Sequence, residues 1–181
     1  MHDDASAYRR YIDGDERGFD EILHTYHDRL IYFIFQYVKH FEDAEDLAAE
    51  TFMELVVHKR RFDFRSSFKT YLFAIARHKA IDHIRREKRR PRVSLEELDR
   101  EQADLVCVEK TIITSQTLEE VKKAIPRLSP DYATYLHLSL FEELGNEEIA
   151  TIMKKTKKQM ANISYRAKNA LREALGKEDA P

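Results

Sequence analysis

DAEDLAAETFMELVVHKRRFDFRSSFKTYLFAIARHKAIDHIRR, residues 43–86, is the stretch that decides the fold. It joins an acidic segment, an aromatic loop and a basic segment without a spacer. Leu47 and Leu55 belong to an apolar set at helical spacing, which predicts an amphipathic helix over residues 41–59. Carboxylates three or four residues apart form a stripe on that helix, at Asp43, Asp46, Glu50 and Glu54. Such a stripe is either a solvated helix face or a docking surface.

Aromatic and basic side chains alternate through the next segment, residues 60–71. Rings can stack on unpaired bases while Arg and Lys hold the phosphate backbone, so this mixture favours contact with single-stranded nucleic acid. The alternative is that Phe62, Phe64 and Phe68 are hydrophobic plugs, and the loop taken alone favours that interpretation. Helical spacing then runs over residues 67–90, and apolar side chains on more than one side predict burial of its first turns.

The end of that helix is strongly basic. Residues 77–92 contain eight Arg and Lys residues against only Asp82 and Glu87. A helix C-terminus favours some positive charge through the macrodipole, but this number exceeds what capping requires. Such a density would release counterions from a phosphate backbone, so the segment predicts contact with nucleic acid.

Three ordered segments of this stretch, residues 43–52, 64–77 and 80–86, resemble conserved region 2 of the ECF-type sigma factors of bacterial RNA polymerase. In that family the acidic helix docks on a coiled coil in the clamp of the large catalytic subunit. The resemblance assigns this role to Asp43, Glu45, Asp46, Glu50 and Glu54. The loop captures a flipped base of the −10 element, and the basic helix holds the upstream edge of the melted DNA. The −10 residues implied here are Phe62, Phe64, Arg65, Ser66, Ser67, Phe68, Lys69, Tyr71, Arg77, Lys79, His83, Arg85 and Arg86.

The segment before this stretch completes a predicted first domain, residues 1–92. Apolar residues at helical spacing predict a core helix over residues 16–39 that pairs with the acidic helix. Tyr32 and Phe35 lie off its main stripe, so we expect a second covered side, with a short helix near residues 5–12 as the cover. Pro91 disfavours helix at the preceding residue and marks the end of the domain.

Residues 93–115 are acidic with few basic partners, which predicts a flexible linker. In the sigma family this connector threads between the two DNA-binding domains.

A second helical domain is predicted over residues 116–176, followed by a tail at 177–181. Ser129 as N-cap and Pro130 at the first helical position open a helix that we expect to end around Gly145. A short helix, a tight turn and a longer helix follow, which is a helix-turn-helix pattern. Thr156 and Gln159 have capping-box spacing at the start of the last helix.

Lysines crowd the start of that last helix, where the macrodipole disfavours cations. A phosphate backbone at this position would make the lysine charges favourable instead, so we predict that the helix enters a major groove. The alternative is a solvated lysine-rich corner. Residues 144–150 and 162–172 resemble region 4 of the same family, whose last helix reads the −35 element and whose domain rests on the flap of the other large polymerase subunit. Ala161 and Ser164 depart from the family pattern. The predicted −35 residues are Lys157, Lys158, Gln159, Asn162, Tyr165, Arg166 and Lys168.

Composition agrees with an all-α fold of two small domains. The chain has 181 residues, 43% of them hydrophobic and 35% charged, with four Gly, four Pro and no Trp. Its net charge of −2 means that local charge clusters, rather than overall charge, govern binding. A single cysteine, Cys107, excludes an internal disulfide, and no signal peptide or membrane-spanning run is found, so we expect a cytoplasmic protein.

The sequence predicts no enzyme, cofactor, metal site or small-molecule substrate. His24 with His27, and His78 with His83, lack the i, i+4 spacing of a helical zinc motif, and no Gly-rich phosphate loop occurs. We therefore expect a promoter-specificity factor whose partners are core RNA polymerase and promoter DNA, with an anti-sigma factor implied by the family resemblance. The alternatives are a stand-alone helix-turn-helix repressor whose first domain only dimerises, and a metal-dependent helical enzyme.

Overall fold

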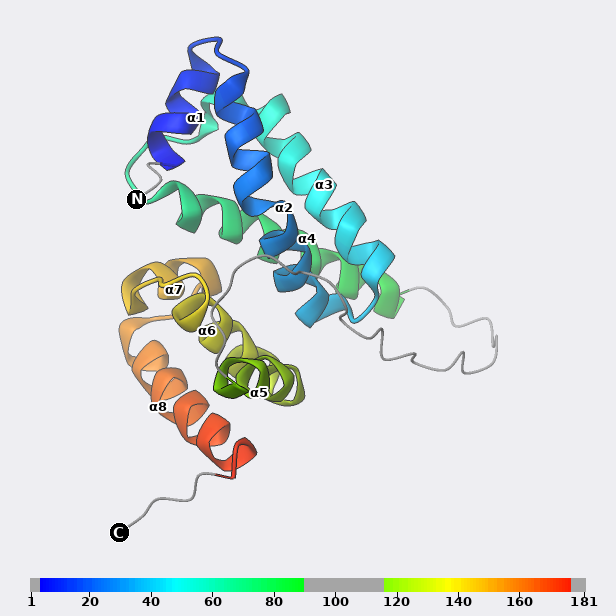
Figure 1. Ribbon diagram of the computed structural model, residues 1–181, viewed down its shortest axis with the longest axis vertical. Coiled ribbons are helices and arrows are strands. Elements are labelled where there is room, and N and C mark those ends of the chain that lie inside the picture. Colours follow the sequence, from blue (N-terminus) through cyan, green and yellow to red (C-terminus); the bar gives the residue numbers. More distant parts are fainter. Residues whose placement is uncertain (1–3, 90–115, 177–181) are drawn as a thin grey trace.

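The computed structural model describes residues 4–89 and 116–176, and within these ranges the chain is helical and has no strand. Figure 1 shows two groups of helices, which we call the N-terminal half (residues 4–89) and the C-terminal half (residues 116–176). The N-terminal half contains α1 (Asp4–Ile12), α2 (Arg17–Val38), α3 (Phe41–Val57), a 3-10 turn (Lys59–Arg61) and α4 (Phe68–Arg89). The C-terminal half contains α5 (Gln116–Ala124), a 3-10 turn (Ile125–Arg127), α6 (Pro130–Leu140), α7 (Asn146–Met153) and α8 (Lys157–Ala174). The predicted linker and tail lie outside the described residues.

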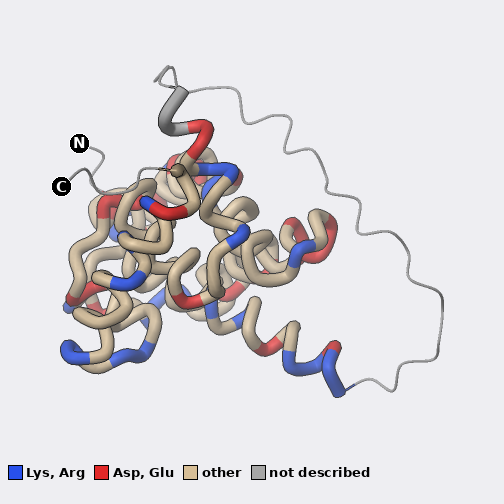
Figure 2. Tube along the Cα trace, turned by 90° about the horizontal axis from the view of Figure 1, so that it is seen from below, with Lys and Arg blue, Asp and Glu red and all other residues tan. Residues whose placement is uncertain are grey.

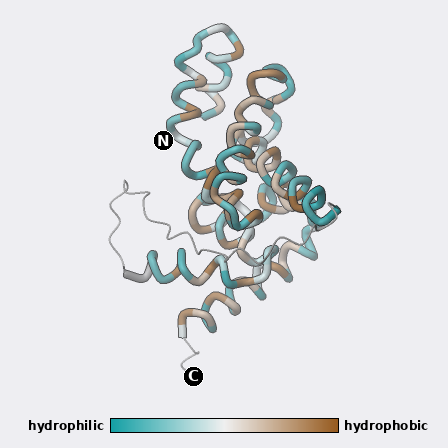
Figure 3. Tube along the Cα trace, turned by 90° about the vertical axis from the view of Figure 1, so that its right-hand side faces the viewer, coloured by the Kyte–Doolittle hydropathy of each residue, from teal (hydrophilic) through white to brown (hydrophobic). Residues whose placement is uncertain are grey.

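Helix α2 is the centre of the N-terminal half, and α1, α3 and α4 pack around it. Tyr8, Tyr26 and Phe68 are fully buried where these helices meet. Gly18 lets α1 approach α2 closely, because a Cβ at this position would lie 2.2 Å from the carbonyl oxygen of Ala7. Hydrophobic and hydrophilic positions are mixed along the helices, as Figure 3 shows. These contacts make a bundle that fixes the orientation of α3 and α4.

The helix-turn-helix predicted in the C-terminal half is formed by α7 and α8. The capping box at the start of α8 is confirmed, because Gln159 N donates to Thr156 Oγ1 at 3.2 Å and Thr156 N donates to Gln159 Oε1 at 2.9 Å. Helix α6 ends at Leu140, earlier than expected, because the chain leaves the helix through a turn in which Glu143 has a φ of 56°. That turn directs Glu142 into the interior, where it is buried.

The two halves pack against each other, and their buried apolar residues form one continuous cluster. Helices α6 and α7 lie against α2 and α4. The expectation for Tyr32 is therefore corrected: α1 does cover α2, but the Tyr32 ring contacts His137 and Phe141 of the C-terminal half. This long-range packing is the main feature of the fold that helical periodicity did not predict.

Candidate nucleic-acid interface

Helix α8 presents the polar residues predicted for −35 recognition along one exposed face. Its buried side consists of Met160, Ser164 and Ala167, which hold the helix against the rest of the C-terminal half. Tyr165 is 69% exposed, although it is a large aromatic residue. All of the predicted −35 residues are exposed, namely Lys157, Lys158, Gln159, Asn162, Tyr165, Arg166 and Lys168. The arrangement is that of a recognition helix with a free outer face.

Partners within the C-terminal half restrain part of this surface. Lys157 Nζ lies 2.7 Å from Glu147 Oε1, and this contact raises the pKa of Lys157 and lowers that of Glu147. Lys155 pairs with Asp131 at 2.8 Å. The Gln159 side chain accepts the capping hydrogen bond described above, so its oxygen is committed to the helix start. Lys158 has no ion pair within the described part of the chain and is exposed.

Ser164, which departs from the family pattern, is explained by a buried polar contact. Its Oγ lies 2.7 Å from the hydroxyl of Tyr135, which in turn donates to Asn146 Oδ1 at 3.1 Å. Ser164 and Tyr135 are 8% and 2% exposed. An aliphatic residue at position 164 would leave the Tyr135 hydroxyl with fewer partners, so serine here matches a tyrosine on α6.

Phe62 and Phe68 of the predicted −10 loop are core residues. They are 4% and 1% exposed, and both rings contact Tyr8. Tyr71 stacks on Phe62 with ring centroids 5.0 Å apart. Burial raises the pKa of the Tyr71 hydroxyl. The hydrophobic-plug interpretation therefore describes Phe62 and Phe68 in this structure, because a base could reach these rings only if the core opened.

Phe64 differs from its two neighbours and remains accessible. Its φ of 59° lies in the left-handed region, which is uncommon for an aromatic residue and costs backbone energy. The guanidinium of Arg9 lies 4.6 Å from the centre of its ring, and the Phe62 ring lies 4.6 Å away. Arg65 and Ser66 follow it and are exposed. A strained, partly exposed aromatic residue beside an exposed arginine is the part of this loop that can meet a base.

The basic residues of α4 fall into two groups. Toward the C-terminal end, Arg85 and Arg86 are exposed, and Figure 2 shows Lys and Arg gathered where α4 ends. Lys79 and His83 instead lie beside α3, with Lys79 Nζ 3.5 Å from Glu50 and His83 Nε2 3.4 Å from Asp43. Ser67, Lys69 and Arg77 contact the C-terminal half.

The acidic residues of α3 are likewise only partly free. Asp43 and Glu50 have the α4 partners just named, and Glu54 Oε1 accepts from Arg61 Nη1 at 3.0 Å. Glu45 and Asp46 are exposed and have no ion pair among the described residues.

Met53 and Val57, which sequence reasoning did not single out, extend this acidic surface. They are 57% and 65% exposed on α3. Each lies three residues after a carboxylate of the stripe, Glu50 or Glu54, and this spacing could have identified them. The α3 surface is therefore both acidic and apolar, which suits a protein partner better than solvent.

Within residues 4–89 and 116–176, no group of His, Cys, Asp or Glu is arranged to hold a metal ion. In the same ranges no helix is long and apolar enough to cross a membrane. Three surfaces are expected of a helical DNA-binding protein that also docks on a protein partner, and they are the exposed face of α8, the loop with the basic end of α4, and the acidic face of α3.

Comparisons with known proteins agree with this class. The Sigma-70 region 2 family matches residues 22–90. The RNA polymerase sigma-H factor of Pseudomonas aeruginosa is 29% identical, with 95% of this chain and 93% of that protein covered. The ECF RNA polymerase sigma factor SigW of Bacillus subtilis is 27% identical over 90% of this chain and 91% of its own length. Among solved structures, RpoE of Bartonella quintana in complex with the anti-sigma factor NepR has a similar fold, with a TM-score of 0.68, 24% identity, and coverage of 89% of this chain and 98% of that chain.

The chain thus carries the Sigma-70 region 2 domain, and over at least nine-tenths of its length it is similar to RNA polymerase sigma factors, including ECF-type ones, which direct transcription initiation by RNA polymerase. Sigma factors are regulatory rather than catalytic proteins, in keeping with the surfaces described above.

Proposed function

We propose that this chain binds core RNA polymerase and directs it to promoters by recognising a −35 element and a −10 element. Residues 1–92 would dock on the polymerase and hold the −10 element, residues 116–176 would bind the −35 element, and residues 93–115 would link them. The observation that carries the proposal is the exposed polar face of α8 in a helix-turn-helix. The chain acts as no enzyme itself, since phosphodiester formation belongs to the polymerase, and it works in the cytoplasm with its partner.

For the −35 element, α8 enters the major groove. Asn162, Arg166 and Lys168 reach base edges or phosphates, and Tyr165 supplies an exposed ring with a hydroxyl. Lys157 and Lys158 hold the backbone at the start of the helix. Lys157 contributes less to phosphate binding because it pairs with Glu147. Lys158 makes the larger electrostatic contribution, because it has no competing ion pair among the described residues.

For the −10 element, Phe64 is the residue that stacks on an unpaired base. Its partial exposure and left-handed backbone support this role, and the exposed Arg65 and Ser66 hold the adjoining phosphates. Phe62, Phe68 and Tyr71 form the base of the loop. Arg85 and Arg86 extend the same electrostatic surface along α4.

Core polymerase docks on α3. Glu45 and Asp46 supply negative charge that is free for an external partner, and Met53 and Val57 supply apolar area. The partner surface complementary to this face is basic with apolar positions between its charges. The family resemblance identifies it with the clamp of the large catalytic subunit, while the C-terminal half rests on the flap of the other large subunit.

An anti-sigma factor is the further partner that the family implies. Support comes from solved structures of similar fold, since both RpoE of Bartonella quintana and the protein CnrH were solved with protein partners, the latter with a TM-score of 0.64 at 16% identity. An inhibitor of this chain would have to cover α3 or the DNA surfaces.

Run-off transcription tests the proposed function. Purified bacterial core polymerase is given fragmented host genome with and without the chain, and RNA 5′ ends are mapped. We expect new start sites that share two upstream elements at fixed spacing. Duplex binding by the chain alone, without new starts, would instead support the stand-alone repressor.

Single substitutions then separate the surfaces. Lys158→Ala is expected to weaken holoenzyme binding to promoter duplex and to reduce the slope of log affinity against log salt by about 1, because one phosphate contact is lost. Lys123→Ala on α5 is the matched control, since Lys123 is also an exposed lysine of the C-terminal half. Charge reversal at Glu45 and Asp46 should reduce binding to core polymerase, whereas reversal of the exposed Glu120 should not.

A further inference from the structure

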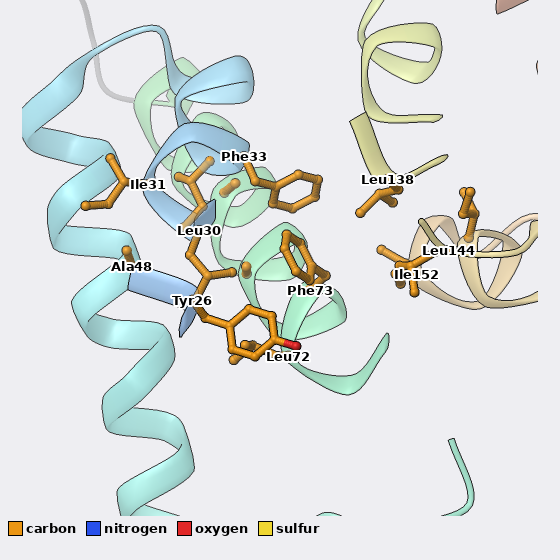
Figure 4. Packing of buried hydrophobic residues seen from close by; sticks show 14 of the residues in the cluster. Tyr26, Leu30, Ile31, Phe33, Ala48, Leu72, Phe73, Leu138, Leu144 and Ile152 are labelled. Atoms are coloured by element: carbon orange, nitrogen blue, oxygen red, sulfur yellow. The ribbon is translucent and has the colours of Figure 1, made fainter. Parts of the chain in front are cut away.

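The C-terminal half packs on the side of the N-terminal half that is formed by α2 and α4. Figure 4 shows Phe33 and Phe73 pointing toward Leu138, Leu144 and Ile152 across this contact. All five residues are buried. A polar network accompanies this apolar contact.

A buried carboxylate is the centre of that network. Glu142, with a side chain only 1% exposed, accepts hydrogen bonds from Nε and Nη2 of Arg29 on α2. His137 Nε2 lies 3.6 Å from Glu142 Oε1, and His137 Nδ1 lies 2.8 Å from the Gln36 amide. The hydroxyls of Tyr37 and Thr134 form a further hydrogen bond between the halves. The Arg29–Glu142, Gln36–His137 and Tyr37–Thr134 hydrogen bonds thus form only when the halves are together, while Gln36 Oε1 and His137 Nε2 are buried without a hydrogen-bond partner among the described residues.

The same contact occupies residues that the family resemblance assigns to the −10 element. Ser67 Oγ donates to Glu148 Oε1 at 2.6 Å, and Lys69 Nζ donates to the carbonyl oxygen of Glu142 at 2.9 Å. Arg77 Nη1 donates to the carbonyl oxygen of Ile152 at 3.5 Å. Carboxylate and carbonyl oxygens here take the hydrogen bonds that phosphate oxygens of DNA would accept.

Promoter geometry also conflicts with this packing. Elements centred about 25 base pairs apart are separated by about 85 Å along a duplex that rises about 3.4 Å per base pair. A compact chain of 181 residues has a radius of gyration of only about 16 Å. The two halves must therefore separate before α8 and the loop can engage both elements together.

We propose that the closed packing of the two halves is an autoinhibited state, in which Glu142 and Glu148 mask the DNA-binding residues at the start of α4. The inference rests on the proposed function of that surface. Opening releases Ser67, Lys69 and Arg77 from their hydrogen bonds to the C-terminal half and frees that half to reach a separate DNA element. The polar character of the contact suits an interface that opens, since interfaces between domains are generally more polar than permanent ones.

Charge reversal at the centre of the network tests closure directly. Arg29→Glu sets two negative charges against each other at the buried Glu142, and neither residue belongs to the proposed DNA surface. The double variant Arg29→Glu with Glu142→Arg restores an opposite pair. Closure is read by energy transfer between dyes on His24→Cys and Leu140→Cys in a Cys107→Ser chain, because both positions are exposed and lie near the Arg29–Glu142 pair in sequence.

DNA masking is read in parallel with a single-stranded DNA 20-mer of mixed sequence. Apparent affinity scales with the open fraction, so Arg29→Glu should lower energy transfer and tighten binding by at least about tenfold. The double variant should restore both values to those of the wild type. Adding Lys69→Ala to Arg29→Glu should remove the gain, which assigns the gain to the unmasked surface rather than to α8.

Each contrary result has a distinct meaning. Low energy transfer in the wild-type chain would overturn closure. High transfer that falls in Arg29→Glu without tighter single-strand binding would overturn masking. Far-ultraviolet circular dichroism identifies a variant that simply unfolds. In that case the charge-swapped double variant tests closure and masking. Absence of new transcription starts with both the wild-type and opened chains would overturn the proposed function instead, whatever the dyes report.

Discussion

The two proposed DNA surfaces of this chain are built in opposite ways. On α8 every residue predicted to contact the −35 element is exposed, and the helix is anchored below by the polar contact of Ser164 with Tyr135. At the loop and the start of α4, Phe62 and Phe68 are buried in an aromatic core. Other residues of that second surface bind the C-terminal half. A preformed, open surface suits duplex DNA, whereas the surface proposed for a melted strand is integrated with the core and partly covered.

This difference predicts whether a substitution can remove a DNA contact without disturbing the fold. On α8, outward side chains can be replaced without touching the core. In the loop, an aromatic residue chosen from its sequence pattern can be either a DNA contact or a structural support, and only its burial distinguishes the two.

The largest expected effect comes from Phe68→Ala. Truncating this fully buried ring should cost about 3–5 kcal/mol of unfolding free energy, because a large cavity remains among Tyr8, Tyr26 and Phe62. Urea unfolding followed by circular dichroism measures the change. The variant should consequently lose polymerase binding along with promoter opening.

Phe64→Ala is the matched comparison within the same loop. Phe64 is only partly buried, so this variant should retain most of its stability and its polymerase binding but open promoters poorly. Permanganate footprinting of unpaired thymines measures opening. Equal losses of polymerase binding in both variants would remove the distinction between contact and support.

Helix positions could be predicted well from the sequence, but of the two predicted caps only that of α8 forms side-chain hydrogen bonds, because the side chain of Ser129 at the start of α6 makes none. The 3.6-residue periodicity and Pro130 gave helix positions close to those observed, and Thr156 with Gln159 marked the start of α8. The roles of the loop residues were harder to predict from the sequence, because Phe62, Phe64 and Phe68 are chemically identical and differ only in their tertiary surroundings. Arg29, Gln36, His137 and Glu142 carried no signal at all, since a polar network between distant segments leaves no local period.

A smaller effect is expected beneath α8. Tyr135→Phe leaves the buried hydroxyl of Ser164 without its partner and should cost about 1–3 kcal/mol of unfolding free energy. Ser164→Ala should cost less, because the Tyr135 hydroxyl keeps Asn146 as a partner. In the Ser164→Ala background, Tyr135→Phe should therefore be less damaging, and a double-mutant cycle from urea unfolding measures this coupling.

Additive effects would mean that Ser164 and Tyr135 do not share the hydrogen bond. The same variants connect support to function, because a displaced α8 should bind promoter duplex more weakly even though no outward residue has changed. Tyr132→Phe is a suitable control on α6, as Tyr132 has no side-chain hydrogen bond among those of the described residues and is only partly buried.

The smallest expected effect is a pH dependence of closure. Burial raises the pKa of Glu142, but the interactions with His137 and Arg29 outweigh burial and hold its pKa below the ordinary value of 4.5. Burial likewise raises the pKa of Glu148, while hydrogen bonds from Ser67, Gly145 and Thr70 and the charge of Lys69 lower it overall. Both carboxylates therefore favour the closed state most when ionised. Solvent screening limits the effect, since the Arg29 side chain is 35% exposed.

The sign of this dependence follows from linkage. A carboxylate whose pKa is lower in the closed state stabilises closure fully above its ordinary pKa, and that stability is lost as pH falls through the lowered value. Energy transfer between the dye pair should thus be constant near neutral pH and fall below about 4.5, before far-ultraviolet circular dichroism reports loss of helix. Glu142→Gln and Glu148→Gln together should remove this early opening. An unchanged opening curve in that double variant would mean that other groups control closure, and the covered −10 surface would then owe its stability to the apolar contact of Phe33 and Phe73 with the C-terminal half.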